Sequence, residues 1–192
     1  MKVTDQGLNN VINGSPLESK AFNVVFKGDN STLTIEDGVR FINCNLYLHS
    51  NAKISIGRDG YIRGSFLAHD HCEIEVGSEL RCNSYLNIST AEKTKVSIGN
   101  DCLVAEATIR TSDMHPIFDV NTGQRINHSS NVIIGDHCWL GQGAFIGKNV
   151  TIGENSVVGA YAVVVKSFPS NVVIGGNPAK KIKENVTWEK RL

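Results

Sequence analysis

Residues 134–169 carry the clearest hydrophobic pattern in the chain, a repeat of six residues. The segment divides into the hexapeptides IGDHCW, LGQGAF, IGKNVT, IGENSV, VGAYAV and VVKSFP. Each begins with an aliphatic residue, and glycine stands second in all but the last. An amphipathic helix would space its apolar residues by three and four, and a half-buried strand would alternate every second residue. The pattern predicts instead short strands separated by sharp corners.

The same repeat predicts how these strands stack. Three hexapeptides would make one turn of a triangular coil, with the first and fifth residues facing inward. The inward residues would be Ile134, Leu140, Ile146, Ile152, Val158 and Val164 at the first positions, and Cys138, Ala144, Val150, Ser156, Ala162 and Phe168 at the fifth. A coil can bury its apolar side chains only against the next coil, through parallel strands. We therefore expect an all-β parallel β-helix.

Aliphatic corner residues of the same kind recur before this segment. They are Ile35, Ile56, Val76, Ile98, Ile134 and Ile152, at spacings of 21, 20, 22, 36 and 18 residues. The spacing of 18 is one plain coil, and the spacings of 20 to 22 are one coil with a few added residues of bulge or corner. The spacing of 36 is either two coils or one coil plus a loop. The turn-forming residues 116–127, which lack the repeat, favour the loop.

The predicted organisation is one domain with two short flanks. Residues 22–176 form the β-helix, with a protruding loop at about 116–131 that follows His115. Residues 1–21 carry turn formers and little periodicity, so they predict an N-terminal arm that is loose or forms a short helix. Residues 177–192 are expected to be a short C-terminal tail.

Three motifs, in this order, resemble the hexapeptide-repeat acyltransferases. They are DMHP at 113–116, IGDHCW at 134–139 and GGNPAK at 175–180. The set is similar to the maltose and galactoside O-acetyltransferases. The longer motif DMHPIFD and the region of Trp188 resemble the capsular and polysialic acid O-acetyltransferases more closely. The resemblance implies a left-handed β-helix, acetyl-CoA as co-substrate, and a homotrimer with active sites between subunits.

His115 is the candidate catalytic residue. An imidazole titrates near neutrality, so it can take the proton of an alcohol as that oxygen attacks a thioester. The resemblance implies this role for His115 in direct transfer of an acetyl group to a sugar hydroxyl, with no covalent enzyme intermediate. Asp113 would share its direction in an extended segment and could orient the ring. From the residues alone, a solvent-facing histidine and a solvated turn aspartate remain the alternatives.

Trp139 is the candidate for acceptor binding, because stacking of the coils does not require a large ring there. A flat indole face suits the C–H groups of a sugar ring, and the resemblance places Trp139 in the acceptor site. Tyr85, Asn87 and Arg110 are further candidates for the acceptor cleft. If the hexapeptides stay in phase, Trp139 and His115 lie at different corners, about 15 Å apart. One hydroxyl could then meet both only between two chains of a closed oligomer.

The coenzyme site is expected where two corners stack. Gln142 and Ala160 are 18 residues apart, and Gly141 and Gly159 beside them would keep the wall low enough for a long pantetheine chain. By resemblance, Gln142 and Ala160 match coenzyme positions. The residues that match phosphate-binding positions are Lys166, Lys180 and Lys183. The backbone amide of Gly141 is a candidate for stabilising the oxyanion.

Charge and composition exclude several other classes. Lysine plus arginine total 19, as do aspartate plus glutamate, so no net field attracts nucleic acid or an anionic membrane. The N-terminal residues lack the apolar run of a signal peptide, and no segment is long enough for a membrane span, so we expect a cytoplasmic protein. Five cysteines without a CxxC pair argue against a disulfide framework.

Three alternatives to O-acetyl transfer remain at this point. Carbonic anhydrases of the same solenoid type hold zinc with histidines, and His69-Asp70-His71-Cys72 offers a candidate cluster. Neighbouring residues of a strand point to opposite sides, so Cys72 could not join His69 and His71, and we predict no metal. An N-acetyltransferase acting on an amino sugar is the second alternative. A non-catalytic scaffold is the third, because the repeats alone require only stacking.

Overall fold

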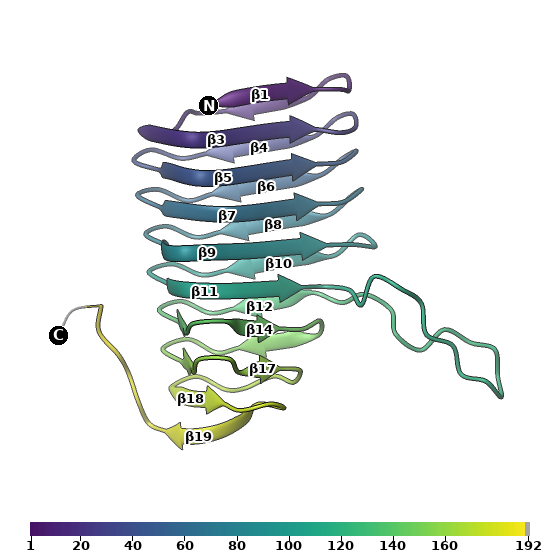
Figure 1. Ribbon diagram of the computed structural model, residues 1–192, viewed down its shortest axis with the longest axis vertical. Helices are drawn as coiled ribbons and strands as arrows, with labels where there is room; N and C mark the ends of the chain where they lie inside the picture. The colour runs from purple at the N-terminus through teal and green to yellow at the C-terminus, as the bar shows by residue number, and fades with distance from the viewer. Residues whose placement is uncertain (191–192) are drawn as a thin grey trace.

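The computed structural model describes residues 1–190, and within them the chain winds into a parallel β-helix (Figure 1). In Figure 1 the nearer strands run from left to right, and the chain returns behind them while it descends from the N-terminus. The coils are therefore left-handed, as the family resemblance implied. The parallel β-helix confirms the predicted all-β fold. Every regular element among residues 1–190 is a strand, so this part contains no helix that could cross a membrane.

The strands form two hydrogen-bonded sheets. The larger contains 12 strands: β1 (Lys2–Asp5), β3 (Glu18–Phe26), β5 (Arg40–Leu48), β7 (Tyr61–Ala68), β9 (Arg81–Thr90), β11 (Leu103–Arg110), β13 (Trp139–Leu140), β14 (Ala144–Ile146), β16 (Val157–Val158), β17 (Val163–Val164), β18 (Val172–Gly175) and β19 (Lys180–Glu184). The smaller contains seven: β2 (Val11–Asn13), β4 (Thr32–Ile35), β6 (Lys53–Ile56), β8 (Glu73–Val76), β10 (Lys95–Ile98), β12 (Val132–Ile134) and β15 (Val150–Ile152). Strands that neighbour each other in these sheets lie one coil apart in the chain and run parallel, apart from the antiparallel pair β18 and β19.

The register of the smaller sheet resolves the spacing of 36 residues. The predicted corner residues pair directly from coil to coil along this sheet. Ile98 of β10 lies opposite Ile134 of β12, with no coil between them. The interval is therefore one coil plus a loop, as predicted. The loop leaves the stack after β11 and returns at β12, and it protrudes clearly from the solenoid in Figure 1.

The core is one continuous column inside the coils. The 12 inward positions predicted from the hexapeptides are all buried. Each large aliphatic side chain buried in this way contributes about 1.5–3 kcal/mol. The one polar member, Ser156, donates a hydrogen bond to the Glu154 carbonyl at 3.2 Å and accepts one from the Val172 amide at 3.3 Å. Cys102 and Cys138 are buried and unpaired, as expected for small core residues.

The corners of the upper and lower coils differ in construction. In the upper coils, one long strand bends at a bulge and covers two sides of the coil, as in β5, whose pairing with β7 shifts between Phe41 and Cys44. In the lower coils two short strands, β13 and β14, lie against β11 instead. The turn 141–143 joins β13 to β14. It lies opposite the bulge beside Glu106, where the register between β9 and β11 shifts. These bulges explain the 20 to 22 residues of the upper coils.

The N-terminal flank differs from its prediction. Residues 1–21 are neither a loose arm nor a helix, because they form β1, β2 and the start of β3, and β1 pairs with β3 over four residues. They are the first coil of the β-helix. The C-terminal tail contains β19, which runs antiparallel to β18, and then passes back along the solenoid (Figure 1). There Trp188 is buried.

Candidate active site

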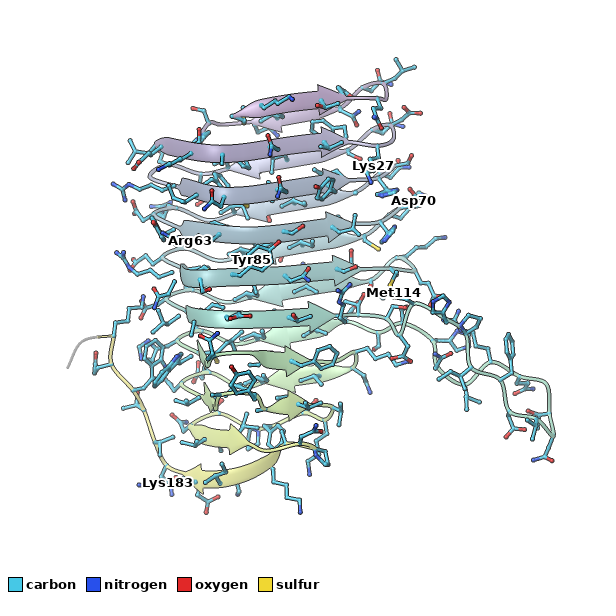
Figure 2. All side chains as sticks on the ribbon, in the orientation of Figure 1. Lys27, Arg63, Asp70, Tyr85, Met114 and Lys183 are labelled. Carbon is cyan, nitrogen blue, oxygen red and sulfur yellow. The ribbon has the colours of Figure 1, made fainter. Side chains whose placement is uncertain are left out.

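His115 lies in a turn where the chain leaves the solenoid. Strand β11 ends at Arg110, and the following residues run into the protruding loop. The His115 side chain is exposed at the root of this loop. Its neighbour Met114, labelled in Figure 2, has a φ of 67°. A left-handed conformation is unusual for a residue of this size, so the surrounding contacts must hold the turn in place.

Asp113 is bound by two side chains that the sequence did not point to. Lys148 Nζ lies 2.5 Å from Asp113 Oδ2, and the Asn127 side-chain amide donates to the same oxygen at 2.9 Å. The hydrogen bond from Lys148, and then that from Asn127, hold the pKa of the Asp113 carboxyl below its usual range. The carboxylate is thus engaged with the loop and the next coil, and a contact with the His115 ring, one of the two roles that the sequence left open, is not among its hydrogen bonds.

A second ion pair fixes the returning half of the loop. Arg125 Nη1 lies 2.5 Å from Glu92 Oε1, and the Ser129 amide donates to Glu92 Oε2 at 3.0 Å. The hydrogen bond from Arg125 is the main reason why the pKa of Glu92 falls to about 2. Glu92 belongs to the corner between β9 and β10, one coil above His115. The loop is therefore anchored at its return as well as at its start.

A surface pocket of about 600 Å³ lies beside the His115 turn, on its N-terminal side. It is lined by corner residues of four successive coils, including His69, His71, Lys93 and Met114. The His69 ring lies 4.7 Å from the ring of His49, and burial followed by the charge of His49 lowers the pKa of His69. Both polar and apolar groups line this pocket, which suits it to a sugar ring.

His115 and Trp139 lie at opposite ends of β11. Trp139 pairs with Leu103 at the start of that strand, whereas the His115 turn follows its last residue, Arg110. A strand of eight residues separates them by roughly 20 Å. The structure confirms that the two side chains occupy different corners within one chain.

Trp139 packs against the returning C-terminal tail. The ring centroids of Trp139 and Trp188 are 5.9 Å apart, and the ring of Trp188 stacks on that of His137 at 4.5 Å. Trp188 is 7% exposed, whereas Trp139 keeps 38% of its surface exposed. The Trp188 indole N–H donates to the His137 carbonyl at 2.7 Å. The tail thus supports one side of Trp139 and leaves a face open to a ligand.

His137 fastens this tail through both ring nitrogens. Nδ1 lies 2.7 Å from Asp101 Oδ2 and Nε2 lies 2.9 Å from the Trp188 carbonyl oxygen, and Asp101 also pairs with Lys190. Partial burial acts to lower the pKa of His137. The Trp188 carbonyl and the Asp101 carboxylate outweigh this effect, so the pKa lies above its ordinary value of 6.5. Both acceptors are satisfied only by the protonated ring, which carries two N–H donors.

Raising the pH is expected to loosen the tail. A raised pKa means that the stabilisation is complete below pH 6.5 and is lost as the pH rises through the higher pKa of the docked state. The protein has two tryptophans, Trp139 and Trp188, and their fluorescence emission should shift to longer wavelength over this rise. A His137→Gln variant, which cannot titrate, should show no such shift. Constant emission in the unaltered protein above pH 6.5 would contradict this prediction.

The other predicted acceptor residues lie on the outer face of the large sheet. Tyr85 and Asn87 belong to β9, and Tyr85 lies in the middle of this face in Figure 2. Tyr85 pairs with Glu106 of β11, whereas Arg110 lies at the end of β11 beside the His115 turn. Only Arg110 is therefore brought next to His115 within one chain. Tyr85 and Asn87 occupy the sheet between the two corners.

Some of the predicted coenzyme residues lie together in the structure. The corners of Gln142 and Ala160 stack as expected: the Tyr161 amide donates to the Gln142 carbonyl at 2.7 Å. The Gln142 side chain also donates to Glu106. A Cβ on Gly141 would lie 2.9 Å from the Ala160 amide nitrogen, so glycine is needed for this close stacking.

The Gly141 amide is not free to bind an oxyanion. It donates to the Val158 carbonyl at 2.8 Å as part of the coil-to-coil ladder, and the Gly159 amide likewise donates to Ile174 at 2.7 Å. The expectation for the Gly141 amide was therefore wrong. A corner glycine carries a second function only if its N–H points out of the ladder, and the hexapeptide pattern does not reveal this direction.

The three lysines lie at three different places. Lys180 pairs with Gly175, next to the corner of Gly159. Lys166 follows β17, and its ammonium lies 5.6 Å from the centre of the Phe168 ring. Lys183 pairs with Val173 at the edge that carries Trp139. Lys180 is thus the lysine that lies beside the stacked corners.

The possible zinc cluster does not assemble. Cys72 is buried in the core. Across residues 1–190, no three side chains of histidine, cysteine, aspartate or glutamate converge as they would around a metal ion.

Comparison with known proteins extends the match in fold to the whole chain. A family model described as bacterial transferase hexapeptide (six repeats) matches residues 131–166. The polysialic acid O-acetyltransferase of Neisseria meningitidis is 38% identical over 194 residues, which cover 98% of this chain and 90% of the relative.

Two solved structures agree with this match. The crystal structure of the polySia specific acetyltransferase NeuO superposes with a TM-score of 0.93 and 33% sequence identity, covering 99% of this chain and 89% of the other. A galactoside acetyltransferase in complex with coenzyme A gives a TM-score of 0.55 and 25% identity over 71% of this chain and 72% of the other. The chain therefore belongs to the hexapeptide-repeat acetyltransferases, the family that includes the polysialic acid O-acetyltransferases.

Proposed function

We propose that the protein transfers the acetyl group of acetyl-CoA to a sugar hydroxyl of a capsular polysaccharide, and that this polysaccharide is polysialic acid. The observation that carries the proposal is the 38% identity to the polysialic acid O-acetyltransferase of Neisseria meningitidis over 98% of the chain. The similar galactoside acetyltransferase was solved with coenzyme A, which supports acetyl-CoA as the donor. A cytoplasmic location would give the enzyme access to this donor.

His115 acts as the general base in the proposed mechanism. Its exposed imidazole takes the proton of the acceptor hydroxyl while that oxygen attacks the thioester carbonyl carbon. The tetrahedral intermediate then collapses with cleavage of the C–S bond. The proton held by His115 passes to the departing thiolate, so the products are the acetyl ester and coenzyme A with a free thiol. One imidazole serves both proton transfers, and no group on the enzyme is acetylated.

The donor groove is proposed to run past the stacked corners of Gln142 and Ala160. Gly141 and Gly159 supply no side chains there, so a pantetheine arm can approach the backbone. Lys180 lies next to these corners and is the lysine best placed for a phosphate group. Lys166 and Lys183 lie at other parts of the fold, and they would meet the same coenzyme only if it spans two chains.

The acceptor is proposed to bind between two chains of a homotrimer. Trp139 lies roughly 20 Å from the His115 turn of its own chain. A second chain packed alongside can bring its Trp139 to that turn, with Asp113 and Arg110 at the rim and Tyr85 and Asn87 on the facing sheet. The pocket of about 600 Å³ beside Met114 would take a neighbouring sugar of the polymer.

Acetyl transfer by the purified protein tests this function. With acetyl-CoA and polysialic acid, a chromogenic thiol reagent should report coenzyme A release, and mass spectrometry should find acetyl groups that mild alkali removes. Alkali-lability identifies an ester on oxygen. Free sialic acid, a galactoside and glucosamine serve as competing acceptors in parallel reactions. Alkali-stable acetyl groups on glucosamine, without acetylation of polysialic acid, would refute the proposal in favour of N-acetyl transfer.

A further inference from the structure

A side-chain amide from the far side of the loop contacts the turn that presents His115 at three points. Asn127 is 12 residues further along the chain and 7% exposed. Its side-chain nitrogen donates to the His115 carbonyl at 2.8 Å and to Asp113 Oδ2 at 2.9 Å. Its side-chain oxygen accepts from the Ile117 amide at 2.6 Å. The amide thus holds the backbone on both sides of the imidazole.

The turn requires such a restraint because its own backbone is strained. Met114, which directly precedes His115, has a φ of 67°, a conformation that side chains of this size avoid. The Met114 amide donates to the Ser112 hydroxyl at 3.0 Å, and the backbone hydrogen bonds between the two halves of the loop, such as that from the Ile126 amide to the Ile117 carbonyl at 2.9 Å, lie beyond the strained residue. A strained turn keeps one conformation only when its surroundings determine it. The contacts of Asn127 span the strained residue, from Asp113 on one side to Ile117 on the other.

Asn127 is itself fixed from two neighbouring coils. Lys148, in the corner below, donates to the Asn127 carbonyl at 2.9 Å and pairs with Asp113. Arg125 Nε lies 3.3 Å from the Asn127 side-chain oxygen, while Arg125 is bound to Glu92 in the corner above. The amide is therefore a fixed point between the loop and the rigid coils.

We propose that Asn127 is a positioning residue for acetyl transfer, acting on His115 through the His115 carbonyl and the Ile117 amide. This inference rests on the proposed role of His115 as the base. The Asn127 side chain touches neither reactant. It orients the imidazole toward the acceptor hydroxyl. A displacement of the reacting group by about 1 Å can lower the rate about 100-fold.

Replacing Asn127 should separate positioning from folding and donor binding. Asn127→Ala is expected to lower kcat about 100-fold and to leave the KM for acetyl-CoA and the melting temperature unchanged. Asn127→Asp keeps the shape and the acceptor oxygen but loses both donors, so it should lose the same activity. The matched control is Asn121→Ala on the same loop, an exposed residue whose side chain makes no hydrogen bond within residues 1–190. This control should retain full activity.

A double variant distinguishes the two bonds that Asn127 donates. Asp113→Asn with Asn127→Asp restores a hydrogen bond between these two positions but leaves the His115 carbonyl without its donor. Activity should remain low in this variant. Recovery of the full kcat would overturn the proposed action through His115, and so would full activity of Asn127→Asp.

A measurement that needs no turnover keeps this inference separate from the function. The His115 ring resonance, identified by its loss in His115→Ala, should shift or broaden in Asn127→Ala and remain in place in Asn121→Ala. If the unaltered protein transfers no acetyl group, the proposed function fails, and this resonance still tests the positioning. An unmoved His115 resonance together with an unchanged kcat in Asn127→Ala would overturn the inference alone.

Discussion

His115→Ala is expected to abolish acetyl transfer almost completely, with kcat lowered by about 10² to 10⁴-fold. The loss follows because no other group at this turn can take the hydroxyl proton: Asp113 is bound to Lys148 and Asn127. The side chain is exposed, so its removal should leave the melting temperature and acetyl-CoA binding unchanged. Coenzyme A release with saturating polysialic acid measures the effect.

His128→Ala is the matched control for this variant. His128 is also exposed and lies on the same loop, but the proposed mechanism gives it no function. It should retain the kcat of the unaltered protein. A His115→Ala variant with more than about a tenth of the original kcat would exclude His115 as the base.

Mixing two inactive variants tests whether the site lies between chains. When His115→Ala and Trp139→Ala are co-expressed in equal amounts, about one site in four would combine an intact histidine with an intact tryptophan from different chains. Activity should therefore return to about a quarter of that of the unaltered protein. If each chain holds a complete site, the mixture stays inactive.

Gly64→Ala is expected to lower the free energy of unfolding by about 3 kcal/mol or more. Gly64 lies at the bulge of β7 with a φ of 138°, and a Cβ there would lie 1.9 Å from the Leu86 carbonyl oxygen. The obstacle is backbone of the next coil, so no side-chain rotation can relieve it. For a domain of this size the melting temperature should fall by roughly 6–12 °C, as scanning calorimetry would measure.

Gly60→Ala is the control for the loss of a glycine in the same coil. A Cβ on Gly60 would meet its nearest atom, Ile62 Cδ1, at 3.4 Å, which is ordinary contact. This variant should change the free energy of unfolding by less than about 1 kcal/mol. Equal destabilisation by both variants would show that the close contact between β7 and β9 is not the cause.

The solenoid could be predicted because its determinants repeat. Aliphatic residues such as Ile98, Ile134 and Ile152 recur at each coil and pair directly in the structure. The first coil escaped prediction for a physical reason. Among residues 1–190 it contacts another coil on one side only, and every residue of β1 is exposed, so its strands need no regular apolar positions. Hydrophobic periodicity records burial, and an end coil has little of it.

The surroundings of His115 could be predicted only in part. The exposed turn and its separation from Trp139 followed from the register of the coils. Lys148 could have been found in the same way, because Ile146 pairs with Ile109, which places the next corner beneath the His115 turn. Asn127 could not have been found in this way, because it lies in a loop without a repeat and binds backbone groups of the turn.

The position of the C-terminal tail could not be predicted from the sequence either. Trp188 meets His137 across 51 residues, after the chain has reversed its direction at β19. No periodic signal links the two positions. The contact depends on the path of a short segment along the outside of the solenoid, and such paths are set by a few side chains.

In the part of the chain that the structure describes, β1 pairs with β3 alone, so its outer edge could take a further coil. Five strands of the large sheet, β1, β3, β5, β7 and β9, lie between that edge and β11. A coil added or removed there would change the reach of the molecule above the His115 turn in steps of about 4.8 Å, the spacing of adjacent strands. The opposite end lacks this freedom, because the reversed strand β19 closes it. Variation in chain length among such enzymes should therefore accumulate at the amino-terminal end, where it leaves the chemistry undisturbed.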